Sequence, residues 1–142
     1  MKNQYLIVAE NITYKHNKLS CINIYDQFVS VQLPAEFVFD LAVLCGPGWD
    51  VGSHDIEIKI RINENELLNV GDIKIEIPGK NFVYNAIAPN LKVALGEGLS
   101  SLKFEIYKNN ELIIEREYPI NTLINRTRPE QQAETPLQEA AQ

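Results

Sequence analysis

Hydrophobic and polar residues alternate at every second position along much of the chain. Between Ile56 and Ile62 four isoleucines alternate with three charged residues, and the same alternation recurs in residues 72–77 and 102–107. Successive side chains of a β-strand point to opposite faces, so this pattern predicts strands with one buried face and one solvated face. Before Thr122 no segment shows the apolar stripe of a helix. The sequence therefore predicts an all-β protein.

Short polar segments separate these strands, as is typical of β-sandwiches. Residues 108–111 (Lys-Asn-Asn-Glu) predict a hairpin between strands at 102–107 and 112–118, because asparagine tolerates the positive φ of a tight turn. Residues 15–18 (Lys-His-Asn-Lys) predict a second turn. The full pattern predicts eight or nine strands, including strands at residues 5–14, 19–25, 37–45 and 54–63.

Length and composition predict one domain and a tail. The chain has 142 residues and 45% apolar residues, which suffices for one domain with its own core. We expect the β-sandwich domain to span residues 1–123. Residues 124–142 are polar, with almost no apolar bulk to offset the entropy of ordering them, and we expect a disordered tail there.

Charge argues against two classes of partner. The 13 basic and 19 acidic residues give a net charge of −6, whereas nucleic-acid binding needs clustered Lys and Arg. The longest stretch without charge, residues 81–91, has eleven residues, fewer than a membrane-spanning helix needs. The N-terminal segment does not have the pattern of a secretory signal, so we expect a cytoplasmic protein.

The two cysteines lie in apolar, strand-like segments. A free cysteine in such a segment behaves as a small buried hydrophobe, and in a reducing compartment we expect Cys21 and Cys45 to be free thiols. Neither cysteine has an adjacent basic residue that would lower the pKa of its thiol. We therefore expect neither to act as a nucleophile.

Residues of catalytic type gather in one loop, residues 46–55. This loop holds Trp49, Asp50, His54 and Asp55. One interpretation is a surface loop whose Trp49 closes the end of the core. A second is a ligand-binding loop, because a tryptophan ring beside a carboxylate suits sugar recognition. A third is a metal-assisted hydrolase in which His54 acts with the two aspartates, although their spacing matches no metal motif.

Asp40 is the one charged residue in the apolar segment 37–45. A carboxylate there is costly unless it is paired or hydrogen-bonded. We expect its side chain to reach solvent or to be capped by a Lys or Arg, and a buried Asp40 would hint at function.

Five aromatic residues give a different indication of function: Tyr25, Phe28, Phe82, Tyr84 and Tyr107. Some of these rings could point outward and form a contact surface, although ordinary cross-strand packing explains them equally well.

Several segments resemble a family of small bacterial proteins of unknown function. The similarity lies in residues 9–12 (Ala-Glu-Asn-Ile), 18–26 (Lys-Leu-Ser-Cys-Ile-Asn-Ile-Tyr-Asp) and 99–107 (Leu-Ser-Ser-Leu-Lys-Phe-Glu-Ile-Tyr). It covers about residues 5–120. The resemblance implies an immunoglobulin-like antiparallel β-sandwich in which a late strand pairs with the last one through a hairpin. It implies no activity and no active residue.

The sequence thus predicts a non-enzymatic β-sandwich that binds another protein through a sheet edge, an outward aromatic face or its loops. The alternative function is a small-ligand or carbohydrate-binding module that uses Trp49, Asp50, His54 and Asp55. We expect no cofactor and no metal. The protein partner is unknown, and a homodimer is possible because such a sandwich has edges that must be covered or charged.

Overall fold

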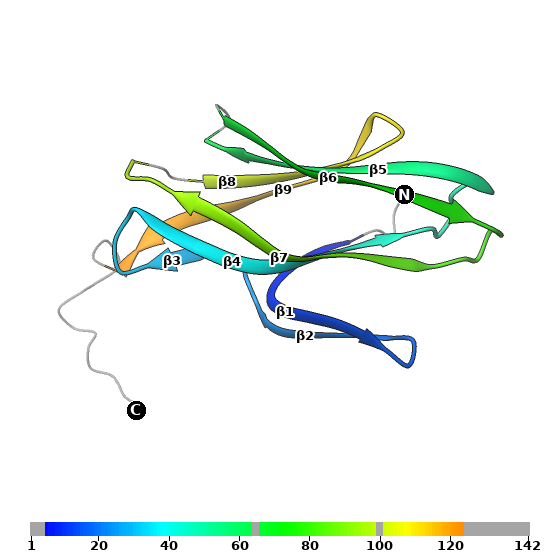
Figure 1. Cartoon of the computed structure of the whole chain (residues 1–142), viewed down its shortest axis with the longest axis horizontal. Coiled ribbons are helices and arrows are strands. Elements are labelled where there is room, and N and C mark those ends of the chain that lie inside the picture. The colour runs from blue at the N-terminus through cyan, green and yellow to red at the C-terminus, as the bar shows by residue number, and fades with distance from the viewer. Residues whose placement is uncertain (1–4, 64–65, 99–100, 124–142) are drawn as a thin grey trace.

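The computed structural model describes residues 5–63, 66–98 and 101–123, and this part of the chain folds into nine β-strands (Figure 1). The predicted all-β class is confirmed. The predicted tail at 124–142 lies outside the described residues. The strands are β1 (Leu6–Lys15), β2 (Lys18–Ile24), β3 (Phe28–Ser30), β4 (Ala35–Cys45), β5 (Gly52–Ile62), β6 (Glu66–Ile77), β7 (Tyr84–Leu95), β8 (Ser101–Lys108) and β9 (Glu111–Thr122).

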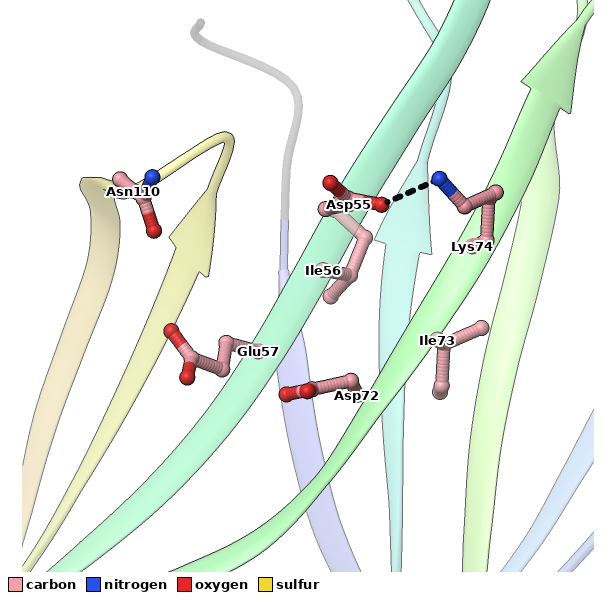
Figure 2. Close-up of a pocket in the computed structure, with 7 residues that line it drawn as sticks. All are labelled: Asp55, Ile56, Glu57, Asp72, Ile73, Lys74 and Asn110. Carbon is pink, nitrogen blue, oxygen red and sulfur yellow. Dashed lines mark ion pairs between the residues drawn. The ribbon is translucent and has the colours of Figure 1, made fainter.

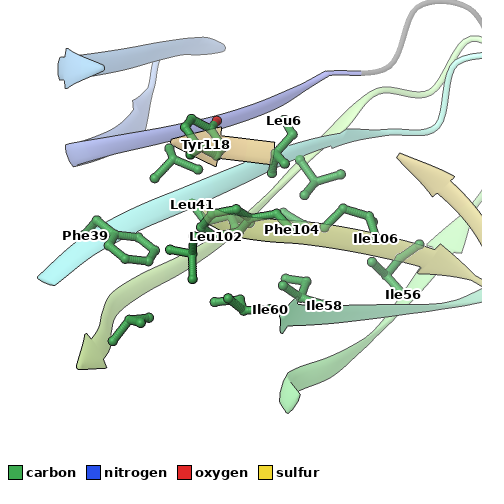
Figure 3. Packing of buried hydrophobic residues seen from close by; sticks show 14 of the residues in the cluster. Leu6, Phe39, Leu41, Ile56, Ile58, Ile60, Leu102, Phe104, Ile106 and Tyr118 are labelled. Carbon is green, nitrogen blue, oxygen red and sulfur yellow. The ribbon is translucent and has the colours of Figure 1, made fainter. Parts of the chain in front are cut away.

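The strands form two sheets. One has the order β2-β1-β4-β7 and the other has the order β3-β9-β8-β5-β6. All neighbouring strands are antiparallel except β3 and β9, which run parallel. The apolar faces of the sheets meet, and Figure 3 shows side chains from both sheets packed between the layers. The described part of the chain contains no helix that is long and apolar enough to cross a membrane.

Four buried aromatic rings connect the two layers. Phe39 of β4 lies 5.8 Å from Phe104 of β8 between ring centroids, and Phe104 lies 5.3 Å from Tyr118 of β9. Phe28 of β3 lies 5.7 Å from Tyr118. The rings of these three pairs meet edge to face, which the charge distribution of aromatic rings favours. The aromatic cluster therefore fixes how the sheets face each other.

The structure confirms the predicted hairpin, and its nine strands agree with the predicted eight or nine, although the pattern did not locate β3 and β7. Asn109 and Asn110 have φ values of 51° and 70°, as a tight primed turn requires. β7 pairs with β4 along its length. Its hydrophobic pattern is broken by Pro89, next to which the register shifts by a bulge and Asn90 takes a φ of 55°.

The hairpin of β1 and β2 forms an arm, residues 11–24, that bends over the outer face of β4 and β7, the other two strands of its sheet. Figure 1 shows β1 and β2 outside the layer of β4 and β7. Ile12 of the arm joins Ala9 and Ala42 in a small second core, against which Leu19 and Cys21 also pack. Both faces of β4 are therefore covered from Phe39 onward.

Asp40 holds the arm to the sheet. Its side chain is 6% exposed, and its two carboxylate oxygens accept hydrogen bonds from the backbone N–H groups of Ile12 and Asn90, at 2.8 and 2.9 Å. The expectation of a solvated or Lys/Arg-capped Asp40 is therefore wrong. The sequence could not reveal these partners, because the two amides come from a bent strand and a bulge.

We expect Asp40→Ala to lower the free energy of unfolding by about 3 kcal/mol, because the N–H groups of Ile12 and Asn90 lose a charged acceptor. Asp40→Asn should cost less, since its single carbonyl oxygen still satisfies one of them. Urea unfolding measures both values. The control is Asp72→Ala, at an exposed aspartate. Equal stability of Asp40→Ala and the control would contradict this role.

Both cysteines are free, and they differ in exposure. Cys45 is fully buried, and burial raises the pKa of its thiol to about 12, although a hydrogen bond with the backbone of Ala86 partly offsets the effect. Cys21 in the arm is partly exposed, and burial also raises the pKa of its thiol. Because the thiolate is the reactive form, both shifts reduce reactivity at neutral pH.

We expect iodoacetamide at pH 8 to modify Cys21 and leave Cys45 unmodified in the folded protein, as read by mass spectrometry of the intact chain and its peptides. A thiol with a pKa of about 12 is almost entirely protonated at that pH. In denaturant both cysteines should react. Modification of Cys45 at the same rate as Cys21 in the native state would contradict the buried environment of Cys45.

Candidate functional site

Trp49 closes one end of the core. It lies in the connection between β4 and β5, where it is only 4% exposed and packs with the main hydrophobic cluster. The ring of His54 lies 5.4 Å from the tryptophan ring, and the Nζ atom of Lys108 lies 4.8 Å from the tryptophan ring centroid. The interpretation of Trp49 as a lid on the core end is therefore confirmed.

His54 stands on the same face of β5 as its buried isoleucines and is 7% exposed. Its Nε2 atom lies 2.7 Å from the carbonyl oxygen of Asp50, and its Nδ1 atom lies 3.1 Å from Nδ2 of Asn109. The Oδ1 atom of Asn109 accepts the N–H of Asp55 at 2.9 Å, so the amide group of Asn109 turns its NH₂ toward the imidazole. Assigned from this network, the neutral ring donates from Nε2 and accepts at Nδ1.

The four predicted site residues do not converge through their side chains. Asp50 contributes its backbone carbonyl, and its side chain is exposed. The carboxylate of Asp55 points to the outer face of the sheet, where it pairs with Lys74 at 3.1 Å. Both nitrogens of the His54 ring already have partners. Among residues 5–63, 66–98 and 101–123 no group of three His, Cys, Asp or Glu residues is arranged to hold a metal ion.

Asn109 and Lys108 are the two members of this end that sequence reasoning missed. Residues 108–111 predicted only a turn, and the turn is where the β8–β9 hairpin reaches over Trp49 and His54. Asn109 therefore has two roles. Its backbone adopts the positive φ of the turn, and its side chain forms hydrogen bonds with this end of the molecule. The polar turn sequence signals the first use and contains no signal for the second.

Outside the tryptophan lies a hollow of about 290 Å³, lined by Gly48, Trp49, Asp50, Val51 and Lys80. Because Trp49 is 4% exposed and stands between His54 and Lys108, its ring offers little open face for a sugar to stack on. Binding of a carbohydrate by this loop stays a prediction, and it would require the loop to open.

Apolar side chains, several of them exposed, lie on the connection that lines this hollow at Val51 and on the neighbouring connection from β6 to β7. Gly46 lies against the backbone of Phe82, where a Cβ atom would overlap the Phe82 carbonyl oxygen, so the β4–β5 and β6–β7 connections are packed together. Val83 is 49% exposed and Tyr84 is 43% exposed, with the Tyr84 ring stacked on Phe82. We call Val51, Phe82, Val83 and Tyr84, which belong to these two connections and the start of β7, the loop end.

A second hollow, of about 380 Å³, lies on the outer face of the five-stranded sheet (Figure 2). Glu57 of β5 and Asp72 of β6 are directly opposite in the register, and Figure 2 shows both carboxylates in the same region. Like charges at such positions are unfavourable. Asp55 and Lys74 form an ion pair beside them. The hollow is therefore acidic. None of the residues that line it has a buried polar atom that points toward a ligand.

The same outer face holds one buried charge, Glu105 of β8, which is 6% exposed. Its two oxygens accept hydrogen bonds from Nε of Arg61 and from the hydroxyl of Tyr107, both at 2.9 Å. The bond to Glu105 raises the pKa of the Tyr107 phenol and that of the Arg61 guanidinium. Tyr107 does point outward as the alternation indicated, but it is bound into this network.

We expect Asn109→Ala to lower the free energy of unfolding by about 1 to 2 kcal/mol and to shift Trp49 fluorescence to longer wavelength, because His54 and Asp55 lose hydrogen-bond partners. The matched control is Asn110→Ala, which changes the other positive-φ residue of the turn, an exposed one. Trp49 is the sole tryptophan, so the emission reports only this end. Equal effects of the two substitutions would assign the loss to the backbone alone.

Comparison with known proteins does not place the chain in a group of known activity. No protein-family model matches it, and no curated protein matches it significantly. Its function is therefore argued from its own residues and their geometry.

Proposed function

We propose that the chain is a non-enzymatic protein-binding module whose loop end contacts the partner. The observation that carries this proposal is the group of exposed large apolar side chains there: Val51 is 64% exposed, and Val83 and Tyr84 follow at 49% and 43%. They stand on connections that are packed against each other at Gly46 and Phe82. A rigid apolar group of this kind binds a partner at low entropic cost.

The titratable groups support binding rather than chemistry. At the predicted site the carboxylate of Asp55 pairs with Lys74, the side chain of Asp50 is exposed, and both nitrogens of His54 are engaged. A general base needs a free nitrogen or oxygen within reach of its substrate. The buried carboxylates of Asp40 and Glu105 likewise serve backbone and side-chain partners of the fold. Shape and apolar contact are therefore the properties that this end offers a partner.

The proposal includes an immunoglobulin-like class for the fold. In that class the first two strands and the fifth lie in one sheet, and the third, sixth and seventh lie in the other. If β2 and β3 are left out of the count, β1, β4 and β7 are the first, second and fifth strands and share one sheet, while β5, β8 and β9 are the third, sixth and seventh and share the other. This arrangement is consistent with the class. Loops at one end of such sandwiches are a recurrent place for partner contacts.

We expect Val51→Glu to abolish capture of the partner by the tagged full-length chain from a lysate of the source cells, because it places a charge within the apolar contact. Val31→Glu is the matched control, since Val31 is also 64% exposed but lies just after β3 rather than in the loop end. Quantitative mass spectrometry of the captured proteins is the measurement. A captured set that is identical for wild type and Val51→Glu would contradict the proposal.

A further inference from the structure

We propose that two copies of this chain pair through the free edge of β2, antiparallel and around a two-fold axis, to form a homodimer. The inference comes from comparing the free sheet edges, which are those of the outer strands β2, β7, β3 and β6 and the part of β9 before residue 120, beside which β3 does not extend. It uses a surface separate from the loop end. It therefore holds or fails independently of the proposed function.

The free edges other than that of β2 carry features that oppose pairing with another strand. An edge strand presents unpaired N–H and C=O groups, and proteins protect such edges with charged residues, proline, bulges or short length. β6 has an exposed Lys74 and a bulge next to Gly71. β7 has Pro89, which lacks an N–H group, followed by the left-handed Asn90. β3 has only three residues, and the part of β9 that it leaves open carries four charges, at Glu111, Glu115, Arg116 and Glu117.

β2 is different, because its central part carries none of these features. From Leu19 to Ile24 it contains no charged residue, no proline and no glycine. Ile22 is 56% exposed and Ile24 is 61% exposed. Asn23, with a φ of 57°, interrupts the strand only near its end. Residues 18–22 thus pair regularly with residues 11–15 of β1 and leave an open edge of five residues on the other side.

The charges at the two ends of the arm indicate that the occupant is a second copy. The tip carries Lys15 and Lys18, and the base carries Glu10 and Asp26, all of them exposed. In the described part of the chain neither lysine pairs with a carboxylate. Antiparallel pairing of two β2 strands places the basic tip of each copy beside the acidic base of the other. The uncharged stretch between the ends lets the strands approach although each chain carries a net charge of −6.

Such pairing also explains the exposed isoleucine at the centre of the edge. Ile22 projects from the outer face of the arm, on the side opposite Leu19 and Cys21, which pack into the second core. Beside a second β2 strand, cross-strand neighbours would cover Ile22. Because both partners use the same edge, the contact is isologous, and neither copy keeps a free β2 edge after pairing. Assembly through β2 therefore stops at two copies.

The first test is sedimentation velocity of the full chain across a concentration series. Wild type should sediment as a species of twice the 16.1 kDa chain mass. Ile22→Lys should sediment as a monomer, because a lysine in the edge becomes desolvated on pairing. The control Leu112→Lys changes an exposed residue of the other sheet, on the charged free edge of β9, and should remain dimeric. Circular dichroism and the melting temperature of the diluted proteins check that each variant folds.

The second test exchanges charges and needs no apolar substitution. Lys18→Glu should raise the dissociation constant of the dimer about tenfold or more, and adding Asp26→Lys should restore it, because the opposite charges then face each other again. Rescue by the second substitution has no explanation in a merely structural role of Lys18.

Three results would overturn the proposal. These are a wild type that stays monomeric at every concentration, a dimer unchanged by Ile22→Lys, and equal loss of the dimer in Leu112→Lys. A β2 edge occupied by a different protein would give the first of these. If the dimer persists while Val51→Glu leaves partner capture unchanged, the proposed function fails and the dimer stands. If Ile22→Lys is monomeric and still captures the partner through the loop end, both hold.

Discussion

The fold depends on one constraint: two sheets that are each apolar on one face must bury those faces against each other. Every second residue of β5 and β8 is used for this, and Figure 3 shows them interleaved with residues of β1, β4 and β9. The stabilisation scales with the apolar area removed from water, so it is spread over many residues. The aromatic contacts among Phe39, Phe104 and Tyr118 add direction to it. All other features, from the arm to the loop end, are attached to this two-layer core.

Three polar or charged residues are buried in the described part of the chain, and each has hydrogen-bond partners. Asp40 accepts two backbone N–H groups, Glu105 accepts an arginine and a tyrosine, and His54 uses both of its nitrogens. Burial of a polar group without partners is costly, so such pairing is the normal state of a stable interior. The contacts that we propose with other molecules use apolar surface and unpaired strand edge instead.

The strands and the hairpin could be predicted from the sequence because their signals are local. Alternating isoleucines define β5, and two asparagines define the turn after β8. The partners of Asp40 and the second role of Asn109 could not be predicted, because they depend on which distant segments the fold brings together. β7 was missed for a different reason: Pro89 breaks its pattern, and the bulge that tolerates the proline exists only opposite β4. At the candidate site, the packing of Trp49 at the end of the core could be predicted from the neighbouring sequence. The outward direction of the Asp55 carboxylate, which pairs with Lys74, could not be predicted without the register between β5 and β6.

The arm has a consequence for how the protein moves. β1 belongs to two cores, because Leu6 and Val8 pack in the main one and Ile12 packs in the small one. The small core has few members, so residues 11–24 rest on little apolar area and on the two hydrogen bonds of Asp40, of which one joins the arm itself. Local stability follows buried area and protected hydrogen bonds. We therefore expect the hairpin to open at lower free energy than the sandwich, so that one strand, β1, is shared between a more stable and a less stable part of the fold.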